Sequence, residues 1–233
     1  MNQEKTKQRE LAQASLKIVK RILEISPQYS GDDLNYLICG SLITNILPLV
    51  KKMDNVELDK ESGIMTPGKT IEISPESQEE LLDVVRPSRS SDIDIAVVGK
   101  DPYNCTIDPK RAPNAGSIKA GLEKEFEMIF PGCHSYGDTL DRLETVRKMP
   151  VLYMSKATLE DGTELMMPSL DAILVFKCRE ALQLRGEKGR KKKEDFVKLY
   201  RVASKLTDAS PLKKYYDQMV KELEKSENPE EER

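Results

Sequence analysis

The segment that most constrains this chain is Asp92–Val98, in which acidic and β-branched residues alternate before a glycine. This pattern predicts a β-strand. Successive strand side chains point to opposite faces, so Asp92 and Asp94 are expected on one face, with Ile93 and Ile95 facing the core. Two carboxylates about 7 Å apart along a strand repel each other unless a cation or a proton lies between them. The pair indicates a Mg²⁺ site that brings substrate phosphates with it, and the alternative is an amphipathic strand with a solvated acidic face.

A second motif lies upstream, where an apolar run ends in Gly40-Ser41 and a helical pattern of apolar residues follows. Glycine lets the backbone approach a ligand closely, and the start of a helix offers free N–H groups to phosphate. Ser41 can add a hydroxyl donor or cap the helix. Pro48 lies inside the pattern and is expected to kink or shorten the helix. Gly-Ser followed by Asp-x-Asp on a strand therefore predicts a combined phosphate and metal site.

Together these motifs resemble those of the DNA polymerase β-like nucleotidyltransferase superfamily. The resemblance rests on Gly40-Ser41 and on the form Ser90-x-Asp92-x-Asp94. It implies that an NTP binds with its triphosphate over Gly40, Ser41 and Ser90. It also implies that Asp92 and Asp94 hold Mg²⁺, which offsets charge developing at the α-phosphorus.

Two further motifs resemble those of AbiEii-type nucleotidyltransferases, which are toxins of toxin–antitoxin pairs. In that family a Lys-x-x-Ala-x-x-x-Arg helix precedes the motif Arg-x-Lys-Asp-x-x-Asp-Leu. The first motif is matched by Lys177, Ala181 and Arg185, with the alanine one place late. The second is matched by Lys192, Asp195 and Leu199, with Glu194 at the place of its lysine and Lys198 at that of its second aspartate.

The resemblance gives roles to two residues of the C-terminal half. Lys177 would neutralise the phosphates, and Asp195 would position Lys177 or the base and sugar. From the residues alone, Lys177 can also snorkel from an apolar helix to water, and Asp195 can stabilise a helix start. Many superfamily members use a third strand carboxylate as general base. Asp141 and Glu144 lie on an expected strand outside the matching motifs, so the third carboxylate is not identified.

Three functions from different classes remain open. The first is nucleotidyl transfer to RNA, such as the tRNA 3′ end, with an antitoxin protein as a further partner implied by the resemblance. A basic run would contact the RNA backbone, or would simply form a solvated loop and helix start; it comprises Arg185, Lys188, Arg190, Lys191, Lys192 and Lys193. The second is transfer to a protein or to a small molecule such as an aminoglycoside. The third is a non-catalytic nucleotide-binding protein.

The order of the expected elements predicts an α+β chain. A nucleotidyltransferase-like mixed sheet flanked by helices is expected over residues 1–168, with an insertion at about 53–88 because Ser41 and Asp92 lie far apart. Residues 53–70 are polar and rich in turn signals, which favours a surface excursion. A helical region is expected over 169–225, including helices from 169 and over 193–206, and a disordered tail over 226–233.

Composition limits the remaining classes. The net charge of −3 gives no global basic field, so any contact with nucleic acid must rest on a local patch. The four cysteines form no C-x-x-C pair, which disfavours a disulfide framework or a zinc site and fits a reducing cytoplasm. No apolar run approaches the ~18 residues of a membrane span, and the N-terminus is polar, so neither a span nor a signal peptide is expected. A cytoplasmic protein without membrane partners is predicted.

Overall fold

A four-stranded antiparallel sheet is the largest β element of the computed structural model, which describes residues 2–25, 34–38, 40–58, 65–86, 95–99 and 154–227. The strand order is β3-β2-β5-β6. The strands are β2 (Val50–Leu58), β3 (Met65–Glu72), β5 (Met154–Leu159) and β6 (Glu164–Pro168). The chain is α+β as expected, but every pairing among the described strands is antiparallel, whereas a mixed sheet was predicted. The β5–β6 pair is joined by a turn at Asp161-Gly162, where Gly162 has a φ of 80°.

The segment 53–70 is not the surface excursion that its polar composition indicated. It supplies most of β2 and β3, and Met53 is fully buried while Ile71 is 2% exposed. The polar residues lie on the other face, where Thr70 Oγ1 donates to Asp54 Oδ1 at 2.7 Å. Lys52 Nζ lies 2.9 Å from Asp54 Oδ2 on the same strand. A strand with one solvated face carries many polar side chains, so the polar composition of this segment is compatible with strands.

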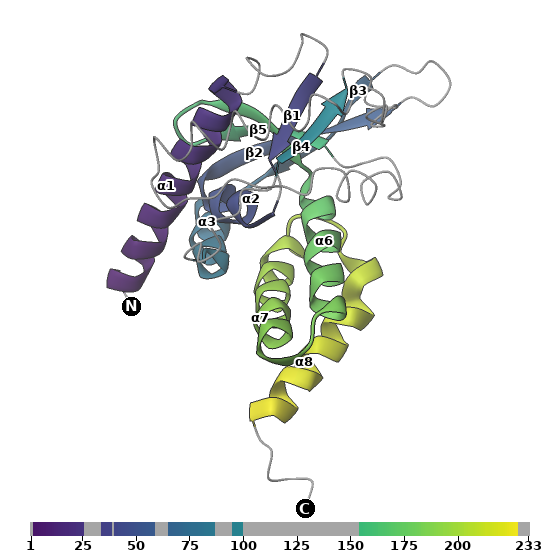
Figure 1. Ribbon diagram of the computed structural model, residues 1–233. Helices are drawn as coiled ribbons and strands as arrows, with labels where there is room; N and C mark the ends of the chain where they lie inside the picture. The colour runs from purple at the N-terminus through teal and green to yellow at the C-terminus, as the bar shows by residue number, and fades with distance from the viewer. Residues whose placement is uncertain are drawn as a thin grey trace, which may run out of the picture.

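A second, two-stranded pair lies beside the large sheet (Figure 1). Strand β1 (Leu34–Ile38) pairs antiparallel with β4 (Ile95–Gly99), and β1 also lies against β6. The predicted strand over 92–98 is confirmed from Ile95 onward. Ser90, Asp92 and Asp94 lie outside the described residues.

Three helices cover the sheet region. They are α1 (Asn2–Ile25), α2 (Gly40–Ile46) and α3 (Pro75–Leu81), and 3₁₀ turns follow α2 at Leu47–Leu49 (η2) and α3 at Leu82–Val84 (η3). The expected shortening at Pro48 is confirmed, because α2 ends before it. Helix α1 begins at Asn2, and its first turns contact α3 and η3, because Lys5 Nζ donates to the Glu79 carbonyl at 2.8 Å and lies 2.7 Å from Asp83 Oδ1.

The C-terminal part is a set of helices below the sheet region (Figure 1). It comprises α6 (Leu170–Gln183), α7 (Gly186–Ala203), a 3₁₀ turn at Ser210–Leu212 (η4) and α8 (Lys213–Glu227). Ser169 caps α6 by accepting from the Ala172 N–H at 3.3 Å. No helix within the described ranges is long and apolar enough to cross a membrane.

Helix α7 begins seven residues earlier than the helix predicted over 193–206, so the basic run is helical rather than a loop. The physical reason is Gly189, which allows the ends of α6 and α7 to approach closely. A Cβ at Gly189 would lie 2.3 Å from the Leu184 carbonyl oxygen. At the other end, α8 includes residues 226 and 227 of the tail that was expected to be disordered, and 228–233 lie outside the described residues.

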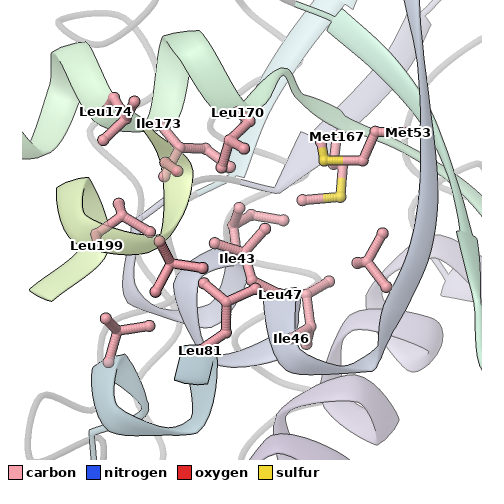
Figure 2. Packing of buried hydrophobic residues seen from close by; sticks show 14 of the residues in the cluster. Ile43, Ile46, Leu47, Met53, Leu81, Met167, Leu170, Ile173, Leu174 and Leu199 are labelled. Atoms are coloured by element: carbon pink, nitrogen blue, oxygen red, sulfur yellow. The ribbon is translucent and has the colours of Figure 1, made fainter. Parts of the chain in front are cut away.

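Helix α2 lies at the centre of the hydrophobic core. Ile43, Ile46 and Leu47 are at most 1% exposed. Figure 2 shows Ile43 directed toward Leu170 and Ile173 of α6. The same cluster includes Met53 and Met167 of the sheet, Leu81 of α3 and Leu199 of α7. The core therefore joins the sheet region to the C-terminal helices around α2.

Candidate functional site

The chain turns sharply between β1 and α2 at Gly40. This glycine has a φ of 71°, a left-handed conformation that side chains other than glycine rarely adopt. The register of the neighbouring pair places Ile38, the last residue of β1, opposite Ile95, the first residue of β4. Gly40 follows Ile38 by two residues, and Asp94 directly precedes Ile95 in the sequence. The turn at Gly40 therefore lies at the end of the pair where β4 begins.

Lys177 continues the apolar stripe of α6. Leu170, Ile173, Leu174 and Lys177 recur at helical spacing and are all buried, and the first two face α2. Lys177 is only 7% exposed, so it does not snorkel into solvent. Burial lowers the pKa of Lys177 from its ordinary value of 10.5, and the carboxylates of Glu180 and Asp195 oppose that shift.

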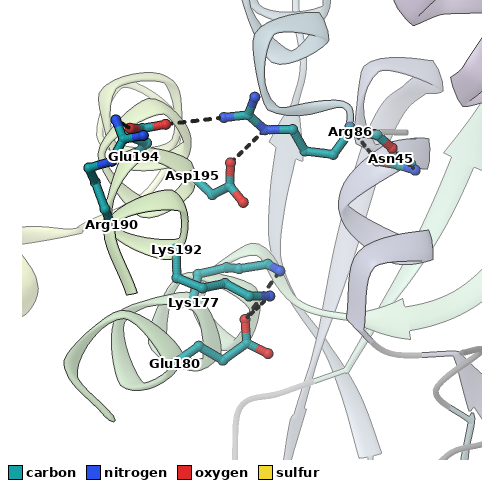
Figure 3. A network of polar contacts seen from close by, with 8 residues as sticks. All are labelled: Asn45, Arg86, Lys177, Glu180, Arg190, Lys192, Glu194 and Asp195. Carbon is teal, nitrogen blue, oxygen red and sulfur yellow. Dashed lines mark hydrogen bonds and ion pairs between the residues drawn. The ribbon is translucent and has the colours of Figure 1, made fainter. Parts of the chain in front are cut away.

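One carboxylate oxygen of Glu180 accepts hydrogen bonds from two lysines. Its Oε2 accepts from Lys177 Nζ at 3.4 Å and from Lys192 Nζ at 3.0 Å. The lysines come from α6 and α7 respectively, and their side chains run next to each other in Figure 3. This contact brings one residue from each C-terminal motif to the same carboxylate.

Asp195 is tied to the sheet region by an arginine. Its Oδ1 accepts from Arg86 Nε at 2.7 Å, and Arg86 Nη2 lies 3.9 Å from Glu194 Oε2. The backbone of Arg86 is clamped by Asn45 of α2, whose Oδ1 accepts from the Arg86 N–H and whose Nδ2 donates to the Arg86 carbonyl, each at 3.0 Å. Asn45 is 2% exposed, and its Nδ2 also donates to Ser15 Oγ at 3.2 Å.

We call this set of contacts the polar junction (Figure 3); it comprises Asn45, Arg86, Lys177, Glu180, Arg190, Lys192, Glu194 and Asp195. It spans α2, the segment that follows η3, α6 and α7. Lys177 and Asp195, the two site residues expected in the C-terminal half, both belong to this junction. Gly40 and Ser41 lie at the other end of α2 from Asn45.

The basic run is largely neutralised within the protein. Arg190 Nη1 lies 2.9 Å from Glu194 Oε1, and Lys191 Nζ lies 2.6 Å from Glu187 Oε1. Lys193 pairs with Glu222 of α8, and Lys192 pairs with Glu180. Arg185 and Lys188 are exposed at the start of α7. The run therefore presents less unpaired positive charge than its sequence indicates.

The third carboxylate is not identified among the described residues. Lys156 of β5 lies 2.6 Å from Glu164 Oε2 across the strand pair. Asp141 and Glu144 lie outside the described residues, as do Asp92 and Asp94. Within the described ranges, no group of three or more His, Cys, Asp or Glu side chains could hold a metal ion.

Sequence reasoning missed the residues that hold the polar junction together. Asn45 carried a signal, because it is a polar residue within an apolar helical run whose neighbours are all buried. Glu180 also carried one, because it follows Lys177 at the i, i+3 spacing of facing helical side chains. Arg86 gave none, because its partners are distant in the sequence. In comparisons with protein-family models, with curated proteins and with solved structures, the chain finds no match.

Proposed function

We propose that this chain is a Mg²⁺-dependent nucleotidyltransferase that moves a nucleoside monophosphate from an NTP to an acceptor hydroxyl. The observation that carries the proposal is the burial of Lys177 beside Asp195, on helices that pack against the helix beginning at Gly40. A buried ammonium is costly unless an anion compensates it, so buried lysines are uncommon outside functional sites and ion-pair networks. Lys177 and Asp195 are also the residues that match the two C-terminal motifs.

The β1–β4 pair supports the proposal independently. Its register brings the Gly40 turn and the residue after Asp94 to one strand end. Asp92 and Asp94 would hold Mg²⁺, because carboxylate oxygens are the donors that this ion prefers. When bound, the ion neutralises charge on the phosphate oxygens.

The chain's own residues position the substrate in this proposal. Gly40, Ser41 and Ser90 bind the triphosphate, and Lys177 neutralises it. The acceptor oxygen then forms a bond to the α-phosphorus, the bond from that phosphorus to the bridging oxygen breaks, and pyrophosphate leaves. The acceptor proton passes to water, and Asp195 keeps Lys177 in place through their electrostatic attraction.

RNA, with the tRNA 3′ end as the first candidate, is the acceptor that the proposal favours. Arg185 and Lys188 are exposed at the start of α7 and are the residues of the basic run best placed to contact a phosphate backbone. Proteins and small hydroxyl compounds are the competing acceptors, and an antitoxin protein is a predicted partner.

The test is label transfer from each of the four α-³²P NTPs, with Mg²⁺, to tRNA, to total protein or to small acceptors. We expect transfer by the wild type and its loss in Asp92→Ala and Asp94→Ala. Asp217→Ala is the matched control, because Asp217 pairs with Lys213 on the surface of α8. Circular dichroism of each variant checks that it folds.

Two results would overturn the proposal. One is the absence of label on every acceptor class with all four NTPs. The other is transfer that persists in folded Asp92→Ala, because a single carboxylate is not expected to hold the cation. The acceptor class that takes up label separates RNA modification from protein or small-molecule modification.

A further inference from the structure

The polar junction carries more positive than negative charge. Its basic residues are Arg86, Lys177, Arg190 and Lys192, and its acidic residues are Glu180, Glu194 and Asp195. Arg86 and Arg190 are engaged with Asp195 and Glu194, which leaves the two lysines to share Glu180. The positive surplus is therefore located where Lys177 and Lys192 converge.

Lys177 is held loosely for a buried ammonium. Its hydrogen bond to Glu180 is 3.4 Å long, near the limit for an N–H···O contact. An ammonium has three N–H donors. Within the described part of the chain, the hydrogen bond of Lys177 Nζ is to Glu180. Because water has little access at 7% exposure, a further anionic oxygen would stabilise Lys177.

Glu180 Oε2 accepts hydrogen bonds from two ammonium groups, as a phosphate oxygen can. A single atom, Oε2 of Glu180, accepts from two ammonium groups on two different helices. Phosphate oxygens accept charge-assisted hydrogen bonds of the same kind, and a polyphosphate offers more of them and more charge than a carboxylate. Glu180 and Lys192 are 28% and 27% exposed, so a ligand from solvent can reach this pair and the glutamate can rotate away.

We propose that Lys177 and Lys192 form a binding site for the terminal phosphates of a di- or triphosphate, and that the Glu180 carboxylate occupies this site in the free protein as a built-in competitor. The identity of the ligand rests on the proposed function, in which pyrophosphate is the leaving group. The roles of Lys192 and Glu180 go beyond it. Ligand binding exchanges one carboxylate for a more highly charged anion and releases the glutamate to solvent.

Binding of inorganic pyrophosphate, measured by calorimetry with EDTA and without nucleotide, tests the site apart from turnover. We expect Glu180→Gln to bind pyrophosphate about tenfold more tightly than wild type, because the competing charge is gone. We expect Lys192→Ala to bind it about tenfold more weakly. Thermal unfolding of each variant verifies that it is folded at the temperature of the titration.

The chain supplies a matched control for each substitution. Glu187 and Lys191 form an exposed ion pair on the same helix as Lys192. Glu187→Gln and Lys191→Ala make the same changes in net charge and are expected to alter pyrophosphate affinity less than about twofold, as exposed charges are screened. Equal affinities for Glu180→Gln and Glu187→Gln, equal affinities for Lys192→Ala and Lys191→Ala, or no binding by wild type and Glu180→Gln would each overturn the inference.

The outcome is distinguishable from that of the proposed function. If the protein transfers nucleotide but Glu180→Gln and Lys192→Ala leave its pyrophosphate affinity unchanged, this inference is overturned and the proposed function is not. The expected affinity pattern in a protein that transfers no label would support the anion site and leave the transferase proposal overturned.

Discussion

Helix α2 is joined to the C-terminal helices by two contacts of opposite chemistry. One is the apolar contact, which we define as Ile43 against Leu170 and Ile173. The other is the polar junction, in which Asn45 holds Arg86 and Arg86 contacts Asp195, while Lys177 and Lys192 share Glu180. The apolar contact removes hydrocarbon from water without requiring directional partners. The polar junction buries charged groups that need partners, so it offers binding chemistry at a cost in stability.

The comparison shows that residues contributing stability and residues contributing binding chemistry lie on the same short helix. Stability comes from the buried apolar residues of α2, whereas its buried polar residue Asn45 bonds to the backbone of Arg86. Substitutions in the apolar contact should change stability most. Substitutions in the polar junction should change ligand binding and pH dependence in addition.

The largest effect is expected for Ile43→Ala. This substitution deletes a side chain that is 1% exposed at the centre of the core. We expect the free energy of unfolding to fall by about 2–5 kcal/mol, because both the burial and the packing of the deleted atoms are lost. Denaturant unfolding measures this change. Leu182→Ala on α6 is the control, since Leu182 is 43% exposed and should cost far less; a similar loss in both would contradict the assignment of Ile43 to the core.

A smaller loss is expected for Asn45→Ala. The substitution removes three hydrogen bonds and leaves the Arg86 N–H without its acceptor. We expect a loss of about 1–3 kcal/mol, the cost of an unsatisfied polar group. Thr44→Val is the control, because Thr44 is also buried and its hydroxyl donates to the Gly40 carbonyl within its own helix. If Thr44→Val were equally destabilising, the clamp on Arg86 would not be the cause.

Substitution of Lys177 is expected to raise stability, in contrast to the two substitutions above, and by an amount that depends on pH. Burial is the main cause that lowers the pKa of Lys177 from 10.5. A lysine with a lower pKa in the folded state binds fewer protons there, so stability rises with pH between the folded value and 10.5. The charged form therefore reduces stability at pH 7, and Glu180 keeps Lys192 as a partner when Lys177 is removed.

We therefore expect Lys177→Met to raise the midpoint of thermal unfolding at pH 7, with a gain that shrinks as the pH approaches 10.5. Lys191→Met, at an exposed position, should give no gain of this kind. A gain for Lys177→Met that is the same at pH 7 and pH 10 would show that packing, and not charge, produces it.

The smallest effect is expected at the edge of the molecule, where Lys20 of α1 contacts the β5–β6 turn. Lys20 Nζ lies 2.5 Å from Asp161 Oδ2, and this contact is the main cause that holds the pKa of Asp161 below its ordinary value. Because both side chains are at least one-third exposed, solvent screens the pair, and Lys20→Ala should cost about 0.2–1 kcal/mol.

The sign of its pH dependence follows from the lowered pKa. A carboxyl with a lower pKa in the folded state stabilises the protein above its unfolded value near 3.8, and the benefit is lost as the pH falls below it. Wild type and Lys20→Ala should therefore converge in acid and in high salt. A difference that survives both conditions would point to lost packing of the lysine stem.

Sequence by itself determined the local elements that follow from short-range chemistry. Ser74 and Ser169 cap helices as their positions predict, Pro48 ends α2, and Gly162 makes the turn between β5 and β6. These features depend on the φ range of one residue or on hydrogen bonds between neighbours, which the chain encodes locally.

Only the tertiary structure decided that residues 53–70 form part of the large sheet and that Arg86 meets Asp195. Half of each strand faces solvent, so a buried strand can look polar, and its pairing partners come from distant parts of the chain. In the same way, the motifs indicated Lys177, Lys192 and Asp195 separately. Their convergence on Glu180 and Arg86 required the packing of α6 against α7, because an ion pair between helices depends on their relative placement and leaves no local pattern in the sequence.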